Sequence, residues 1–247
     1  MQTAHLYAPL RRELIALIQT LGRDEWATPT VCGDWTVGDV VGHLLGVELS
    51  NVGRRRDGWS TGPAPGEDLA SWLAAFNEEW VRAARRLSPE IAARLLDVAG
   101  AWFEEWVASV DLDATGDAVS WAGPERAPVW LDVAREYTER WTHQAQIREA
   151  LGRPLLDEAR YLGPVIATFA HALPHALRAI DAPAGTVATL RVTGPAGGVW
   201  HVHRLSSHWA LRPTPRPRHG DAGWGVLVSF LYLRGRWCLP PPGRSRT

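Results

Sequence analysis

Two residues in the second half of the chain have the types and the spacing of a metal site. Glu139 and His143 fall in a stretch of helical periodicity, so their side chains project from one helix face about one turn apart. A carboxylate and an imidazole placed in this way can bind one divalent cation. A third ligand must come from another element. Of the nine histidines in the chain, His43 is the best candidate, because it lies in the middle of an apolar helical stretch.

Two imidazoles and one carboxylate leave a coordination position open, which is typical of catalytic zinc sites, whereas structural zinc sites use four protein ligands. The donor set also suits zinc best among the divalent metals. A water, a thiolate or a substrate could take the open position. Simpler interpretations exist for each part of the pattern: a surface ion pair for Glu139 and His143, and a core histidine without a metal for His43.

The elements that must position these residues are helices. From residue 4 to about 180 the apolar residues recur at helical spacing, and the breaks fall at residues that cap helices. The expected helices cover residues 5–21, 36–54, 67–87, 88–110, 128–151 and 156–180. Pro164 and Pro174 should kink or split the last of them. Residues 111–127, rich in Asp, Gly and Pro, are expected to form a loop.

The pattern changes after residues 181–185. Segments 186–193 and 199–204 alternate around a Pro-Gly turn and predict a β-hairpin, and residues 208–211 predict a third strand. We therefore expect a mainly α protein with a helical metal-binding domain at 1–180 and a small α+β domain at 185–247. The Pro- and Arg-rich end of the chain is atypical and fits no regular element.

Two segments around the candidate ligands resemble the signatures of the mycothiol-dependent maleylpyruvate isomerase family, a branch of the DinB-like four-helix bundle superfamily. The first signature is the run Trp26-Ala27-Thr28-Pro29-Thr30-Val31-Cys32-Gly33-Asp34-Trp35-Thr36-Val37-Gly38-Asp39-Val40-Val41-Gly42-His43-Leu44. The second is Glu139-Arg140-Trp141-Thr142-His143 with the trailing Ala150-Leu151-Gly152-Arg153-Pro154. The resemblance covers about residues 5–180 and implies a metal held by His43, Glu139 and His143.

The resemblance also implies an activity. True isomerases of the family convert maleylpyruvate to fumarylpyruvate with the thiol mycothiol, and transfer of the same activated thiolate to an electrophile would make the protein a thiol S-transferase. In the family the C-terminal domain contributes an arginine, for which Arg234 and Arg236 are the candidates here, because arginine grips a carboxylate at two points. Many relatives carry an acidic residue at the position of Gln146, which we expect to contact a metal ligand rather than the metal. The alternative to an enzyme is a sensor or interaction protein that binds metal without turnover. A metal-free helical bundle is the third hypothesis.

Composition excludes other classes of function. The 26 basic residues are all arginines and are balanced by 27 acidic ones, for a net charge of −1, which argues against a nucleic-acid binder. The absence of lysine excludes Schiff-base chemistry. The N-terminus lacks a secretory pattern, the apolar run at 226–233 is too short to span a membrane, and two cysteines are too few for a disulfide framework. We expect a cytoplasmic protein whose partners are a small substrate and mycothiol. The residue usage is typical of a GC-rich genome, which fits an actinobacterial source.

Overall fold

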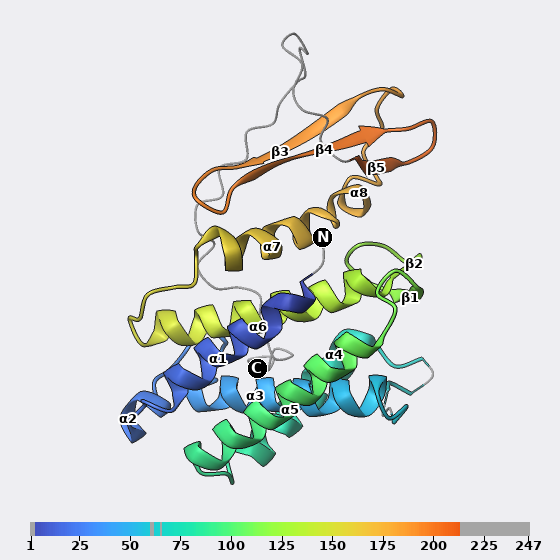
Figure 1. The fold of residues 1–247 in the computed structure, drawn as a ribbon. Helices are drawn as coiled ribbons and strands as arrows, with labels where there is room; N and C mark the ends of the chain where they lie inside the picture. Colours follow the sequence, from blue (N-terminus) through green and yellow to red (C-terminus); the bar gives the residue numbers. More distant parts are fainter. Residues whose placement is uncertain (1–2, 60–61, 65, 213–247) are drawn as a thin grey trace, which may run out of the picture. The chain divides into compact units, whose positions relative to one another are not determined.

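Helices make up most of the structure, a computed structural model that describes residues 3–59, 62–64 and 66–212. In chain order the helices are α1 (Tyr7–Ile18), α2 (Arg23–Trp26), α3 (Val37–Arg55), α4 (Leu69–Ala84), α5 (Pro89–Ser109), α6 (Val129–Ala150), α7 (Ala159–Ala170) and α8 (Leu173–Ala176) (Figure 1). The strands are β1 (Thr115–Ala118), β2 (Arg126–Pro128), β3 (Val187–Val192), β4 (Gly198–Arg204) and β5 (Trp209–Arg212). The expected fold class, mainly α with a small α+β C-terminal part, is confirmed. Within the described ranges, every helix is too short or too polar to cross a lipid bilayer.

Three local features differ from the sequence-based expectations. The last expected helix is split, as predicted, but Pro164 lies inside α7 and the break comes at residues 171–172, just before Pro174. Residues 111–127 are not a plain loop, because β1 and β2 pair antiparallel within and beside them. The short helix α2 was not expected. Elements of three or four residues carry too little periodicity to be recognised in a sequence.

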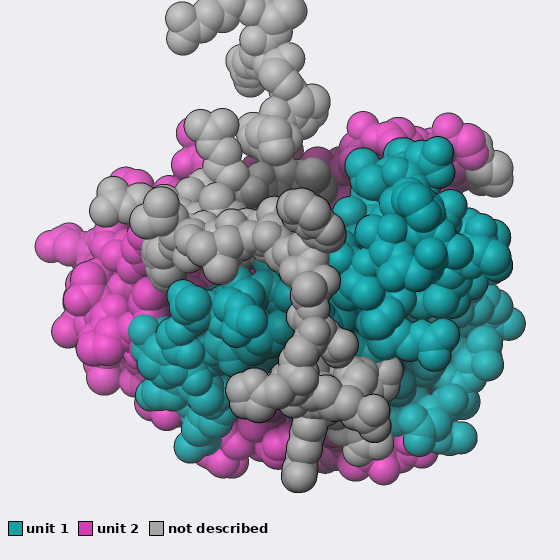
Figure 2. Space-filling view, turned by 90° about the horizontal axis from the view of Figure 1, so that it is seen from above, with its two compact units in different colours: residues 1–3, 111–141, 156–232 teal, residues 4–110, 142–155, 233–247 magenta. Residues whose placement is uncertain are grey.

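The chain forms two compact units, which Figure 2 shows in different colours. In the described part, one unit contains residues 4–110 and 142–155, with α1 to α5 and the C-terminal part of α6. The other contains residue 3 and residues 111–141 and 156–212, with β1, β2, the N-terminal part of α6, α7, α8 and the three-stranded sheet. The domain boundary at 181–185 stays a prediction.

Helix α3 is the central element of the first unit, since α4 and α5 both pack against it and α5 also contacts α1. The hydrophobic core of this unit draws on all of these helices except α4, on a loop residue and on α6. Its members include Leu14, Ile18, Cys32, Val40, Val41, Leu44, Leu96, Ala99 and Ile147. The core therefore surrounds the part of α3 that carries His43.

The sequence explains why α3 begins and packs where it does. Thr36 caps the helix by accepting a hydrogen bond from the Asp39 backbone NH, and the Asp39 carboxylate accepts from the Thr36 NH. Two glycines one turn apart then let α4 approach closely. A Cβ atom at Gly42 would lie 2.6 Å from the Ala84 Cβ, and one at Gly46 would lie 2.4 Å from the Trp80 Cγ.

In the second unit the sheet has the antiparallel order β3-β4-β5, as the alternating pattern predicted. Val202 and Trp209 are buried on the sheet, and the Trp209 indole NH donates to the Ile180 carbonyl. Within the same unit, the Tyr137 hydroxyl of α6 donates to the Tyr161 carbonyl of α7. These bonds satisfy polar atoms that would otherwise be costly to bury.

Candidate metal centre

His43 is buried in α3 between apolar neighbours. Val40, Val41, Leu44 and Leu45 are all buried around it, and the His43 side chain is itself only 3% exposed. A polar ring in such a position must have a polar partner or a ligand to offset its desolvation. The helical register set by the cap at Thr36 therefore aims this imidazole into the protein.

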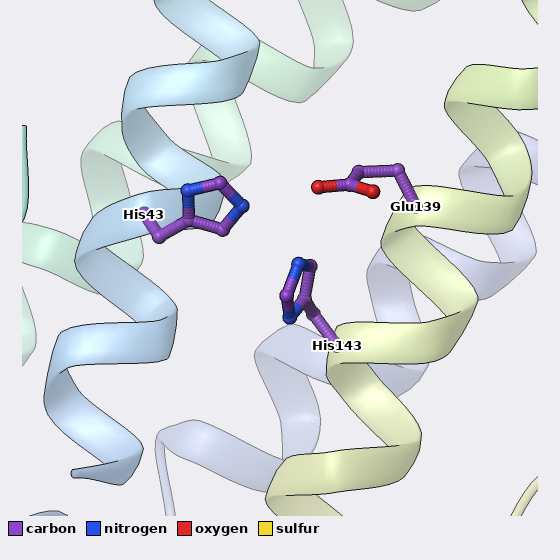
Figure 3. Close-up of side chains that lie close together, drawn as sticks. All are labelled: His43, Glu139 and His143. Atoms are coloured by element: carbon purple, nitrogen blue, oxygen red, sulfur yellow. The ribbon is translucent and has the colours of Figure 1, made fainter. Parts of the chain in front are cut away.

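Glu139 and His143 lie one turn apart on α6, a continuous helix of 22 residues. Their side chains leave the same face of the helix, as the four-residue spacing predicted (Figure 3). His143 is buried and Glu139 is half-buried. The helix ends at Ala150, and Gly152 just beyond it adopts a left-handed conformation with φ of 61°.

The three candidate ligands converge in the structure. Figure 3 shows the His43 ring of α3 facing both Glu139 and His143 of α6. One ligand atom from each residue lies within 4.8 Å of the other two. The two imidazole rings are edge to face, with centroids 4.6 Å apart. Among the residues that the structure describes, this is the only group of three histidine, cysteine or acidic side chains with metal-binding geometry.

The ring of His143 is oriented by Gln146, one turn further along α6. The Gln146 Oε1 lies 2.7 Å from the His143 Nδ1, and because an amide oxygen only accepts, Nδ1 must carry the proton. The other nitrogen, Nε2, then keeps its lone pair and faces Glu139 and His43 (Figure 3). The Cys32 Sγ lies 2.9 Å from the same Gln146 oxygen. A neutral imidazole binds a divalent cation through its unprotonated nitrogen. The donor set of His43, Glu139 and His143 therefore fits a divalent cation.

Trp35 lies beside His43 and binds Glu78, and the sequence did not single out either residue. The Trp35 ring packs on the His43 ring, with centroids 5.1 Å apart, and the Trp35 indole NH donates to the Glu78 carboxylate over 3.1 Å. Trp35 directly precedes the helix cap, so its place in the first signature was a usable signal. Glu78 lies on α4, and nothing in its sequence context relates it to His43.

Acidic and basic side chains alternate along α6 near Glu139 and form ion pairs with one another. Arg135, one turn before Glu139, forms ion pairs with Asp132 and Glu136. Burial lowers the pKa of Arg135, but the charges of Glu136 and Asp132, with a smaller contribution from Glu139, outweigh it and raise the pKa above its ordinary value. A permanent positive charge therefore lies near the Glu139 carboxylate.

The two candidate arginines, Arg234 and Arg236, lie outside the described residues. Other histidines of the chain have partners of their own. His201 is hydrogen-bonded to Thr189 across the sheet, and neither it nor His203 belongs to a metal-binding group. His171 packs edge to face on Trp130, and burial lowers its pKa.

Solved structures with the same fold include two crystal structures of mycothiol-dependent maleylpyruvate isomerase, one of them a histidine-to-alanine mutant. The TM-scores are 0.52 for the enzyme and 0.53 for the mutant, at 12% and 11% sequence identity. Each match covers 79% of this chain and 77% of the solved chain. At such low identity the likeness concerns the fold alone.

Sequence relatives are closer. Two uncharacterised proteins, from two strains of Mycobacterium tuberculosis, are each 30% identical over 209 residues, which is 78% of this chain and 74% of theirs. The family model described as the mycothiol maleylpyruvate isomerase N-terminal domain matches residues 7–148, a span that contains His43, Glu139 and His143. The chain therefore belongs to the mycothiol maleylpyruvate isomerase family.

Proposed function

We propose that this protein is a divalent-metal, mycothiol-dependent enzyme of the maleylpyruvate isomerase type, or a related thiol S-transferase. The observation that carries the proposal is the convergence of one ligand atom from each of His43, Glu139 and His143 within 4.8 Å. Family membership supports the same conclusion, because the matched span contains all three residues. We expect zinc as the metal and the cytoplasm of an actinobacterium as the setting.

Each ligand has a defined part in holding the cation. His143 presents Nε2 because its Nδ1 is bonded to Gln146, and His43 is fixed between its apolar neighbours and the Trp35 ring. Glu139 supplies one negative charge, which leaves a site with three protein ligands net positive when a divalent cation is bound. Three ligands leave a position for an exogenous group.

Bound there, a divalent cation would lower the pKa of a coordinated thiol and make a thiolate available near neutral pH, for reversible addition to an activated double bond or for transfer to an electrophile. The protein's own contribution is to bury His43 and His143, which keeps competing water away from two of the three ligands. Arg135 keeps a positive charge near Glu139 through its ion pairs on the same helix. Neither role consumes or releases a proton on the chain itself.

Arg234 and Arg236 stay our candidates for gripping the carboxylates of a substrate. Replacement of either by glutamine should raise KM for maleylpyruvate while the bound metal is retained. Unchanged KM values in both variants would remove them from this role.

The test begins with the metal content of the purified protein and continues with turnover of maleylpyruvate, and of a panel of electrophiles, with mycothiol present or omitted. We expect one zinc ion per chain and turnover that requires mycothiol. Product analysis separates isomerisation, which returns the thiol, from transfer, which consumes it.

The matched variants are His43→Ala and His208→Ala. The first removes an imidazole from the candidate site, and the second removes one from an exposed position. His43→Ala should lose both metal and activity, whereas His208→Ala should keep both. A protein that binds zinc but lacks thiol-dependent turnover would be the sensor or interaction protein. A metal-free protein that is indifferent to His43→Ala would contradict the proposal entirely.

A further inference from the structure

Helix α5 carries a stripe of exposed apolar side chains. Ile91, Leu95, Val98 and Trp102 lie on its outer face, and each is between 39% and 49% exposed. The opposite face of α5 packs against α3 and α1. Single exposed apolar residues are ordinary, but four large ones in a row on one helix are typical of an interaction surface.

The spacing within this α5 stripe is four, three and four residues. This is the spacing of a coiled-coil seam, in which apolar side chains of two helices interlock along a line. This spacing is the same when it is counted from either end of the helix. A two-fold axis between Leu95 and Val98 would therefore place Leu95 against Val98 of a second copy, and Ile91 against Trp102. Such self-complementarity is the geometric requirement of a two-fold symmetric dimer.

Helix α5 itself suits an antiparallel arrangement. The exposed Arg94 beside the stripe is paired with Glu90 four residues earlier on the same helix, at 2.8 Å, so it needs no partner from a second copy. The dipoles of two antiparallel helices also oppose one another favourably.

One face of Trp102 is already covered, since the Arg56 guanidinium lies 5.5 Å from its ring centroid. Arg56 is itself held by Asp57 through an ion pair. The indole is thereby fixed with its remaining surface outward. An aromatic side chain that loses little conformational freedom on binding is the kind of residue that anchors interfaces.

We propose that the α5 stripe is the interface of a symmetric homodimer, in which two α5 helices pair antiparallel about an axis between Leu95 and Val98. An interface centred on one helix from each copy lies at the small end of the range, below about 1,200 Å² of total buried surface. The dimer should therefore dissociate on dilution. This inference is independent of the metal site and of the enzymatic activity.

Sedimentation velocity of the full chain over a series of concentrations tests the proposal. The protein should shift from monomer to dimer as its concentration rises. Leu95→Arg and Val98→Glu should each weaken self-association by about tenfold or more, because each places an unpaired charge in the apolar stripe. Leu69→Glu is the matched control, because Leu69 is exposed to a similar extent but lies on α4. It should leave association unchanged.

Mixing the two charged variants tests the axis itself. In the proposed dimer residue 95 of one copy faces residue 98 of the other, so Leu95→Arg and Val98→Glu chains should associate with each other more tightly than either associates with itself. Circular dichroism checks that every variant remains folded. A wild-type chain that stays monomeric at all concentrations, a Leu69→Glu effect as large as the others, or a failure of the mixed variants to associate would each overturn the proposal.

Discussion

At the scale of single residues, a hydrogen bond decides which nitrogen of His143 is available to a metal. The Gln146 amide holds the Nδ1 proton, and the fixed tautomer directs Nε2 toward His43 and Glu139. The resemblance to the family predicted that Gln146, three residues after His143, would contact a ligand. That the contact goes to Nδ1, and that Cys32 touches the same oxygen, could be learned only from the folded chain.

Removal of this contact should weaken metal binding without unfolding the protein. We expect Gln146→Leu to reduce zinc affinity by about 10- to 100-fold, because the ring loses its orientation and the lone pair its basicity. Gln146→Glu is the matched variant: it keeps an acceptor at the same place and should bind at least as tightly as the wild type. Competition against a chromophoric chelator measures both affinities, and equal affinity in Gln146→Leu and the wild type would contradict the role.

A second prediction at this scale concerns Asp39. Burial raises the pKa of its carboxyl, but the hydrogen bonds from Arg85 and from the Thr36 backbone outweigh burial, and the net shift is downward. A lowered folded-state pKa stabilises the fold above the unfolded value of about 3.9, and this contribution disappears as the pH falls through the folded value.

Asp39→Asn should therefore lower the free energy of unfolding at pH 7 by about 1 kcal/mol, a modest figure because Arg85 is half-exposed and solvent screens the pair. The difference from the wild type should begin to shrink as the pH falls below about 4, and should vanish only below the lowered folded-state pKa of Asp39. Urea unfolding of the metal-free protein across this pH range measures it. Glu79→Gln, a change at an exposed carboxylate of α4, serves as the control. A pH-independent difference for Asp39→Asn would refute the assignment.

At the scale of elements, the helices that carry the candidate ligands were predictable because their signals are local. The cap at Thr36, the Ser88-Pro89 start of α5 and Gly152 after α6 act within one turn of their own positions. The β1–β2 pair was missed because its strands are short and do not alternate. The close approach of α4 to α3 is likewise not local, although the two glycines that permit it are visible in the sequence.

This close approach gives a prediction with an internal control. Gly46→Ala should destabilise the protein by about 1–3 kcal/mol, because the new methyl group would overlap the Trp80 ring and push α4 away. Gly53→Ala on the same helix meets its nearest neighbour only at 3.7 Å, and should stabilise by up to about 1 kcal/mol through better helix propensity. Chemical denaturation measures the free energy of unfolding of both variants. Equal changes in the two would show that the packing of α4 is not tight at Gly46.

At the scale of the whole molecule, binding of a metal to residues from two distant stretches of the chain should stabilise the folded state. His43 is almost a hundred residues before Glu139 and His143, so an unfolded chain has no preformed site and the ion favours the native state alone. At a free metal concentration of about 100 times Kd the gain is about 2.7 kcal/mol.

Zinc should accordingly raise the Tm by about 5–10 °C over the chelated protein. Calorimetry of the wild type with zinc or with a chelator measures the difference, and His43→Ala should show none of it. A Tm that is the same with zinc and with chelator would argue for the metal-free bundle.

The sequence by itself determined the helical architecture, the β-hairpin after residue 185, the three candidate ligands and the family. These follow from periodicity, caps and short motifs, whose physical causes act over one or two turns of helix. Only the tertiary structure decided that the three candidate ligands meet, that Trp35 packs on His43 and binds Glu78, and that the α5 stripe stays exposed. Contacts between segments far apart in the sequence depend on how whole helices pack, and no local pattern encodes which faces the packing will cover.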